Sequence, residues 1–155
     1  GGGGAGHATF HQFGLHAVLN RKQFALRDEA TGAIDFDTDT FKVMLVTSTY
    51  TPNKDTHAKR SDVTNEVTGS GYTAGGTAST VTVAAVDTVN DRVVITFGAV
   101  SWPSSTITAR GAVYYKSRGG ASSADEIILY DDFGSDVTST GGTFNLAAST
   151  YTKQN

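Results

Sequence analysis

The sequence contains no cysteine, two prolines and one tryptophan in 155 residues, and only 17% of its residues are charged. The absence of cysteine excludes a disulfide framework and thiol chemistry, although it leaves the redox compartment open. The net charge of −3 argues against direct nucleic-acid binding, which needs a basic surplus to neutralise phosphates. No apolar run approaches the roughly 18 residues of a membrane span, and no signal peptide pattern opens the chain. We therefore expect no membrane partner.

A chain of this length is expected to form one domain with a substantial core. The opening GGGGAGH, residues 1–7, is interpreted as a tag or linker, with a natural glycine-rich arm as the alternative. Residues 8–155 are then expected to form a single β-rich domain.

Short segments in which β-branched and aromatic residues alternate with threonine, serine or lysine predict antiparallel strands. The fold class predicted is mainly β: an antiparallel β-sandwich or barrel. The expected strands are residues 41–47, 79–86, 92–97, 106–116, 126–133 and 143–148, with 63–67 as an edge strand or extended loop. The expected loops are residues 50–60, 69–76, 117–124 and 135–142. Residues 89–91 are expected to form a turn that joins the strands 79–86 and 92–97 in a hairpin. The predicted core contains Val43, Leu45, Val94, Ile107, Val113, Ile128 and Leu146.

One N-terminal helix is predicted over about residues 9–23. Thr9 and Gln12 have the spacing of a capping box, and apolar residues follow at helical intervals from Phe10 and Phe13. Residues 24–26 extend this helix or form a short strand, and the pattern does not decide between the two. The segment 41–47 is apolar on both faces except at Lys42, so it is expected in the sheet interior under this helix.

The aspartates Asp35, Asp37 and Asp39 begin like a calcium-binding loop. The series lacks the glycine expected at Thr40 and the closing glutamate expected at Val46. The alternative is that the three side chains share one solvated strand face. We predict no metal site.

No pattern of catalytic residues is recognisable in the remaining polar groups. The histidines show neither an i, i+4 ligand pair nor the signature of a catalytic triad; they are His7, His11, His16 and His57. The glycine-rich residues 69–76 lack the ending of a phosphate-binding loop and are interpreted as a loop needing positive φ. Neighbouring carboxylates point to opposite faces of a strand rather than across a cleft; they are Asp125, Glu126, Asp131 and Asp132. We predict no enzyme activity and no cofactor.

The aromatic residues at strand ends offer a sugar-binding platform as one interpretation and core anchors as the other. They are Trp102, which precedes Pro103, and Tyr114, Tyr115, Tyr130 and Tyr151.

Four segments carry a resemblance to a known family: IDFDTDTFKVMLVTSTYTPNKDTH (residues 34–57), NEVTGSGYTAGG (65–76), WPSSTITARGAVYYK (102–116) and DFGSDVTSTGGTFNL (132–146). In this order they resemble a widespread family of small virion structural proteins of tailed bacteriophages. The resemblance implies a β-rich, non-catalytic component of the phage particle, made in the bacterial host cytoplasm and incorporated in the virion. It leaves open two roles: a capsid decoration protein on the head exterior, or a tail or fibre component, with contact to host glycans as one option for the latter.

The leading hypothesis is a capsid decoration and stabilisation protein. Its expected partners are the phage major capsid protein and copies of itself. Long loops are often functional, so the expected assembly contacts lie in the N-terminal segment and in two loops. The residues concerned are Phe10, Phe13, Tyr50, Pro52, Asn53 and Tyr72.

Overall fold

The computed structural model describes residues 20–23 and 34–154, which are mainly β and form two antiparallel sheets. The strands are β1 (Asn20–Gln23), β2 (Phe41–Val46), β3 (Thr77–Ala78), β4 (Val81–Val83), β5 (Arg92–Phe97), β6 (Val100–Lys116), β7 (Ile127–Leu146) and β8 (Ser149–Gln154). The five-stranded sheet has the order β1-β7-β6-β2-β3, and the three-stranded sheet has the order β4-β5-β8. Two 3-10 helices, η1 (Arg60–Asp62) and η2 (Ser122–Ala124), lie in loops. The mainly β class predicted from the sequence is confirmed.

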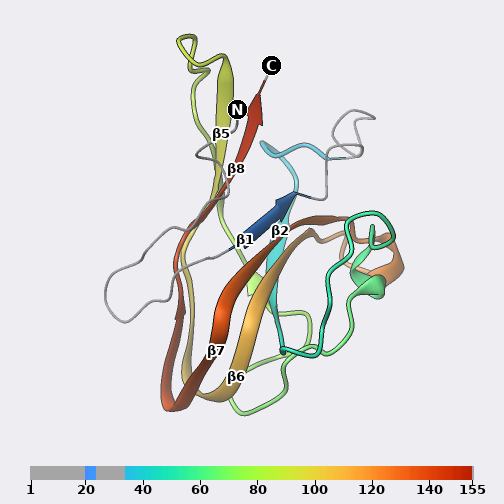
Figure 1. Cartoon of the computed structure of the whole chain (residues 1–155), viewed down its shortest axis with the longest axis vertical. Helices are drawn as coiled ribbons and strands as arrows, with labels where there is room; N and C mark the ends of the chain where they lie inside the picture. Colours follow the sequence, from blue (N-terminus) through green and yellow to red (C-terminus); the bar gives the residue numbers. More distant parts are fainter. Residues whose placement is uncertain (1–19, 24–33, 155) are drawn as a thin grey trace.

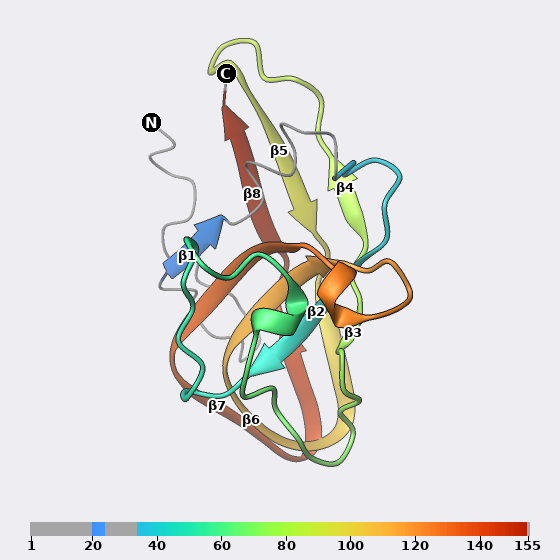
Figure 2. The ribbon, with the colours of Figure 1, turned by 90° about the vertical axis from the view of Figure 1, so that its right-hand side faces the viewer.

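One long antiparallel ribbon connects the two sheets. β5 pairs with β8 until Phe97 stands opposite Ser149, and β6 resumes the ladder with β7 at Val100, opposite Leu146. The β6–β7 ladder shifts register at four points, and such irregularities bend strands and increase their twist. Figure 1 accordingly shows β6 and β7 as long curved strands, and both views show β5 and β8 projecting from one end of the molecule (Figures 1 and 2).

The five-stranded sheet is apolar on both faces. Alternation along β2 sends Val43 and Leu45 into the main core, which also receives Ile95 and Phe97 from β5. Met44 and Val46 point the other way, into a second cluster closed by Tyr50 and Val63 of the following loop together with Val113, Tyr115, Ile127 and Tyr130. The two-faced burial predicted for β2 is therefore confirmed, and a loop supplies part of the cover on the second face.

Six of the seven predicted core residues are buried: Val43, Leu45, Ile107, Val113, Ile128 and Leu146. The prediction for Val94 is wrong, because this side chain is only half-buried. Its neighbours Val93 and Ile95 pack in or against the main core, and side chains alternate along β5.

The end of the predicted N-terminal helix is a strand. Asn20–Gln23 forms β1 and pairs with Asp132–Leu129 of β7, so the helix prediction is wrong for these four residues. The rest of the predicted helix, with Thr9, Phe10 and Phe13, lies outside the described residues.

The predicted loop at residues 135–142 is also wrong, because β7 runs through it. Thr138 and Ser139 pair with Thr108 and Ile107 of β6, while Gly134 and Gly141 adopt positive φ angles of 80° and 62°. The predicted hairpin is confirmed: β4 pairs with β5 across a turn at residues 88–91, which includes the predicted turn residues 89–91. Residues 63–67 form an extended loop with one bridge, between Glu66 and Val46.

Candidate functional site

The predicted assembly residues do not come together in one described site. Phe10 and Phe13 lie outside the described residues. Tyr50 belongs to the second cluster, whereas Tyr72 packs against the main core on the other face of the sheet.

Tyr50 holds its own loop in place. It is buried, its hydroxyl lies 2.9 Å from His57 Nδ1, and its ring stacks on the His57 ring at 5.6 Å between centroids. Burial, with a smaller effect of the Asp62 charge, raises the pKa of Tyr50 to about 12. Of the loop residues predicted as contacts, Pro52 is half-buried and Asn53 is exposed, so both remain accessible.

His57, the one histidine in the described residues, therefore has a positioning role. Its Nδ1 contacts the Tyr50 hydroxyl and the Asn53 N–H rather than a serine. This geometry gives no support to a catalytic triad. His7, His11 and His16 lie outside the described residues.

Tyr72 anchors the glycine-rich loop. Its hydroxyl donates to Glu66 Oε2 at 2.5 Å and accepts from the Leu45 N–H at 2.9 Å. The same Glu66 oxygen accepts the Gly75 N–H at 2.7 Å. Burial and the hydrogen bond to Glu66 raise the pKa of Tyr72, which keeps its hydroxyl protonated.

The glycine-rich loop passes close to β2. Gly71, Gly75 and Gly76 adopt φ angles of 80°, 91° and 77°, which side chains other than glycine rarely adopt. A Cβ added to Gly76 would lie 1.7 Å from the Val43 carbonyl oxygen. These glycines permit a tight passage of the backbone, which agrees with the interpretation of a loop that needs positive φ.

The aspartate series lies in a turn rather than on a strand face, so the predicted shared face is wrong. The Asp35 N–H donates to Asp39 Oδ2 at 2.7 Å, and the Asp37 N–H donates to Asp35 Oδ1 at 2.9 Å. Asp39 also pairs with Lys116 at 2.8 Å. Burial opposes ionisation of Asp39, but the Asp35 amide and the Lys116 ammonium outweigh it and lower the pKa of Asp39. Two of the three carboxylates thus have partners within the chain.

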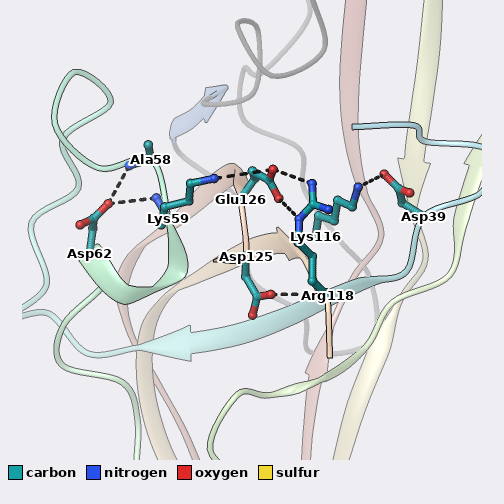
Figure 3. Close-up of polar contacts among 8 residues, drawn as sticks. All are labelled: Asp39, Ala58, Lys59, Asp62, Lys116, Arg118, Asp125 and Glu126. Atoms are coloured by element: carbon teal, nitrogen blue, oxygen red, sulfur yellow. Dashed lines mark hydrogen bonds and ion pairs between the residues drawn. The ribbon is translucent and has the colours of Figure 1, made fainter. Parts of the chain in front are cut away.

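A charged cluster links the loop before β3 to the loop between β6 and β7 (Figure 3). Buried Glu126 binds the Arg118 guanidinium in bidentate fashion, at 3.0 and 2.8 Å, and lies 3.6 Å from Lys59 Nζ. Buried Asp125 accepts Arg60 Nε at 2.8 Å and the Arg118 N–H at 2.9 Å. Burial raises the pKa of Glu126, but the hydrogen bond from Arg118 and the nearby cations more than offset this, so its pKa is lowered.

Asp62 and Arg60 make further contacts at the edge of this cluster. Asp62 Oδ2 accepts the N–H groups of Ala58 and Lys59, each at 2.9 Å, and these bonds lower the pKa of Asp62. The Arg60 guanidinium also lies over the Tyr115 ring, 5.0 Å from its centroid. Every carboxylate in this cluster has a cation or an amide as partner, which makes it a cross-link between two loops.

The remaining predicted carboxylates also fail to form a facing pair. Asp131 is buried and accepts the Ser149 hydroxyl, which in turn accepts the Tyr114 hydroxyl at 3.2 Å. Asp132 accepts the Gly134 N–H at 2.8 Å. The two side chains therefore stabilise different local contacts.

The aromatic residues predicted as a sugar platform are core anchors. Trp102 is 5% exposed, and its ring contacts those of Tyr72 and Phe144. The four tyrosines of the predicted platform are 0–4% exposed; they are Tyr114, Tyr115, Tyr130 and Tyr151. The platform interpretation is therefore wrong, because no ring of this set presents a face to solvent.

A hollow of about 330 Å³, not predicted from the sequence, lies between β2, β6, β7 and the loop before β3. Most of its lining residues are threonine or serine; the full lining is Thr47, Glu66, Thr68, Thr106, Ile107, Thr108, Thr138 and Ser139. The Thr108 and Thr138 hydroxyls bond each other at 2.9 Å. The lining comes from four distant segments, so no local sequence signal marks it.

Within residues 20–23 and 34–154, no group of three or more histidine, aspartate or glutamate side chains is arranged to hold a metal ion. No helix in that part of the chain is long and apolar enough to cross a membrane. Comparison with protein-family models, curated proteins and solved structures finds no match to the chain.

Proposed function

We propose that this protein is a structural component of a tailed-phage particle, most simply a capsid decoration protein that binds the head exterior and stabilises contacts between capsid subunits. The proposal includes an antiparallel sandwich or barrel arrangement of the two sheets, no turnover chemistry, and a location in the virion. Its partners are the major capsid protein and neighbouring copies of this chain.

The observation that carries the proposal is the placement of the four segments that resemble phage virion proteins. They supply β2, the glycine-rich loop, most of β6 and most of β7. β2 pairs with β6, β6 pairs with β7, and the loop is bound to β2 through Tyr72 and Leu45. The resemblance therefore covers one contiguous structural unit.

The surface chemistry of the loops also supports an assembly role. Asn53 and several glycine, serine and threonine residues of the two predicted contact loops are exposed, while the buried acids Asp125 and Glu126 are bound internally. The exposed Lys54 and Asp55 of the first loop carry opposite charges, so little net charge there opposes close neighbours. Many copies on a lattice stabilise a shell even where each contact is weak, because the contacts act together.

The test is to add purified protein to phage particles that lack it and then heat or osmotically shock them. We expect saturable binding to heads and better retention of DNA. Mass spectrometry of wild-type particles should give a copy number in the hundreds, which is the scale of a capsid lattice rather than of a fibre. Binding only to tails, or a handful of copies, would replace the decoration role with the tail or fibre alternative.

A matched pair of variants locates the contact. Pro52→Arg changes a half-buried position in a predicted contact loop, and Gly120→Arg adds the same charge where an added Cβ meets no atom within 4 Å. We expect Pro52→Arg to weaken binding to heads and Gly120→Arg to bind as the wild type does. Equal binding by both variants would remove this loop from the interface.

A further inference from the structure

The hairpin formed by β4 and β5 holds every large hydrophobic residue that is exposed in the described part of the chain. Val83, Val86 and Val89 have exposed fractions of 41%, 63% and 90%. Burying such side chains is favourable, so their gathering on one projecting element marks a surface suited to contact.

The same hairpin presents an unpaired strand edge. Among the described residues β4 pairs only with β5, and Figure 2 shows it on the side of β5 away from β8. The Gly98 N–H donates to the Thr80 carbonyl at 2.7 Å, and the Ala84 N–H donates to the Val94 carbonyl at 2.9 Å. Antiparallel strands alternate the direction of their backbone groups, so the N–H and C=O groups of Val81 and Val83 point outward.

An apolar groove of about 280 Å³ lies beside this edge. Its apolar lining comes from Val83 of β4, from Val93 and Ile95 of β5, and from Ile34 and Phe36 of the segment before β2. Val83 and Ile95 are cross-strand partners, so their side chains share the face of the sheet that borders the groove.

The polar groups of the groove are acidic. Asp35 and Asp37 line it, and both are exposed. Asp39 is neutralised by Lys116, whereas the Asp37 carboxylate has no ion pair or hydrogen bond within the described residues. At the hairpin turn Asp87 pairs with Arg92 at 3.5 Å, and the charged residues that line the groove itself are Asp35 and Asp37. The groove lining is therefore acidic.

This charge decides between two kinds of occupant. A second copy pairing edge to edge would bring its own aspartates toward these aspartates, and like charges at an interface oppose binding. A basic partner would neutralise them. A three-residue edge strand also offers too little area for a stable dimer by itself.

We propose that the β4 edge and this groove form a docking site for an extended segment of a partner protein, one that carries aliphatic residues flanked by lysine or arginine. The segment adds as a strand to β4 through the outward backbone groups of Val81 and Val83. Alternate aliphatic side chains enter the groove, and the basic residues pair with Asp35 and Asp37. The site follows from the geometry of this chain and does not depend on the proposed virion role.

The test uses a fluorescein-labelled eight-residue peptide of alternating valine and threonine with a lysine at each end. A matched peptide carries glutamate at each end. Fluorescence anisotropy with the full chain should show saturable binding of the lysine peptide that weakens with salt. We expect the glutamate peptide to bind at least about tenfold more weakly, since like charge opposes it.

Two variants and a control test the two halves of the site. Asp37→Lys should shift the preference toward the glutamate peptide. The Val83 N–H points away from β5, so Val83→Pro removes this donor without removing a ladder bond, and proline is tolerated on strand edges. This variant should abolish binding of both peptides. Val89→Thr, at the hairpin tip outside the groove lining, should bind as the wild type does.

Three results would overturn the proposal: no binding of the lysine peptide, equal binding of both peptides, or no effect of Asp37→Lys. Sedimentation of the protein alone supplies a further check. Self-association that Val83→Pro removes would assign the edge to a second copy instead of a basic partner. Each result is independent of whether the protein binds phage heads, so failure of this site and failure of the proposed function are distinguishable.

Discussion

Tyr72 and Leu45 are joined by a hydrogen bond in which a side-chain hydroxyl takes the place of a neighbouring strand. β3 pairs with β2 only at Lys42 and Val43, so the outer backbone groups of β2 beyond that point need other partners. The Leu45 N–H donates to the Tyr72 hydroxyl at 2.9 Å, and the Leu45 carbonyl accepts the Val67 N–H at 2.9 Å. The loop before β3 thereby continues the sheet edge through the Tyr72 side chain and the Val67 backbone amide.

We expect Tyr72→Phe to destabilise the protein by about 1–3 kcal/mol, because it leaves the buried Leu45 N–H without an acceptor and removes one of the two donors to Glu66. Urea denaturation measures the change. Thr138→Val, which removes one hydroxyl of an exposed pair, is the control and should cost less. An unchanged midpoint for Tyr72→Phe would mean that water replaces the hydroxyl at no cost.

Leu45→Ala should cost about 2–4 kcal/mol, since Leu45 is fully buried and its removal leaves a cavity in the main core. Val94→Ala should cost clearly less, because Val94 is half-buried and lies outside that core. Val89→Ala, at 90% exposure, is the surface control. Equal losses of melting temperature for Val94→Ala and Leu45→Ala would contradict the orientation of β5, in which Val94 points away from the main core.

Gly76→Ala and Gly119→Ala separate backbone strain from steric overlap. Both glycines have positive φ, 77° and 81°, but only at Gly76 would an added Cβ overlap the backbone of β2. Positive φ alone costs of the order of 1–3 kcal/mol, so Gly119→Ala should fall at the low end. Gly76→Ala should cost more or prevent folding. Equal unfolding midpoints for the two variants would show that the loop moves away from β2 freely.

Acid should destabilise the protein through its paired carboxylates. The folded-state pKa of Glu126 is lowered, so the unfolded chain binds the proton more readily than the folded chain. The resulting stability is present above the unfolded pKa of about 4.3 and is lost as pH falls through the folded pKa. Denaturant midpoints measured from about pH 7 to about pH 2 should fall below about pH 4.

Glu126→Gln should be less stable than the wild type at neutral pH. In acid the two stabilities should converge, because the glutamine variant has no carboxylate charge to lose at this position. The variant keeps the size of the side chain but not the ion pair with Arg118. Parallel pH curves for the variant and the wild type would exclude Glu126 from the acid transition.

Calcium and chelators should leave the melting temperature unchanged. Asp39 is paired with Lys116, and Asp35 accepts the Asp37 N–H, so the turn does not present three free carboxylates. Differential scanning calorimetry with calcium and with chelator provides the measurement. A rise in melting temperature with calcium that disappears in Asp37→Ala would overturn this expectation.

Local periodicity predicted the elements whose burial follows a simple alternation. β2 and β5 begin where the sequence predicts them, and the hairpin turn lies at the predicted residues. Six core positions follow from the same alternation. The error at Val94 is a choice of face, because Val93 and Val94 are identical in type and only tertiary packing decides which of them points inward.

The elements and contacts that the sequence did not predict depend on pairing between residues far apart in the chain. Residues 135–142 are rich in serine, threonine and glycine, which favour turns, yet the ladder to β6 holds Thr138 opposite Thr108 as part of β7. Asn20–Gln23 follows a helical pattern in the sequence, but these residues form β1 because they pair with β7. In the charged cluster, Arg118 and Glu126 are close in sequence. Arg60 and Asp125 lie in loops far apart in the sequence, so no local pattern predicts their contact.

The long ribbon also sets the order in which the chain can fold. β6 and β7 are separated only by the short loop that holds η2, so their pairing requires closure of a small loop with a low entropic cost. β1 pairs with β7 across most of the chain, and such contacts of high sequence separation slow folding. We therefore predict that the β6–β7 hairpin, held at its loop by the Arg118–Glu126 ion pair, forms first and that β1 pairs with it later.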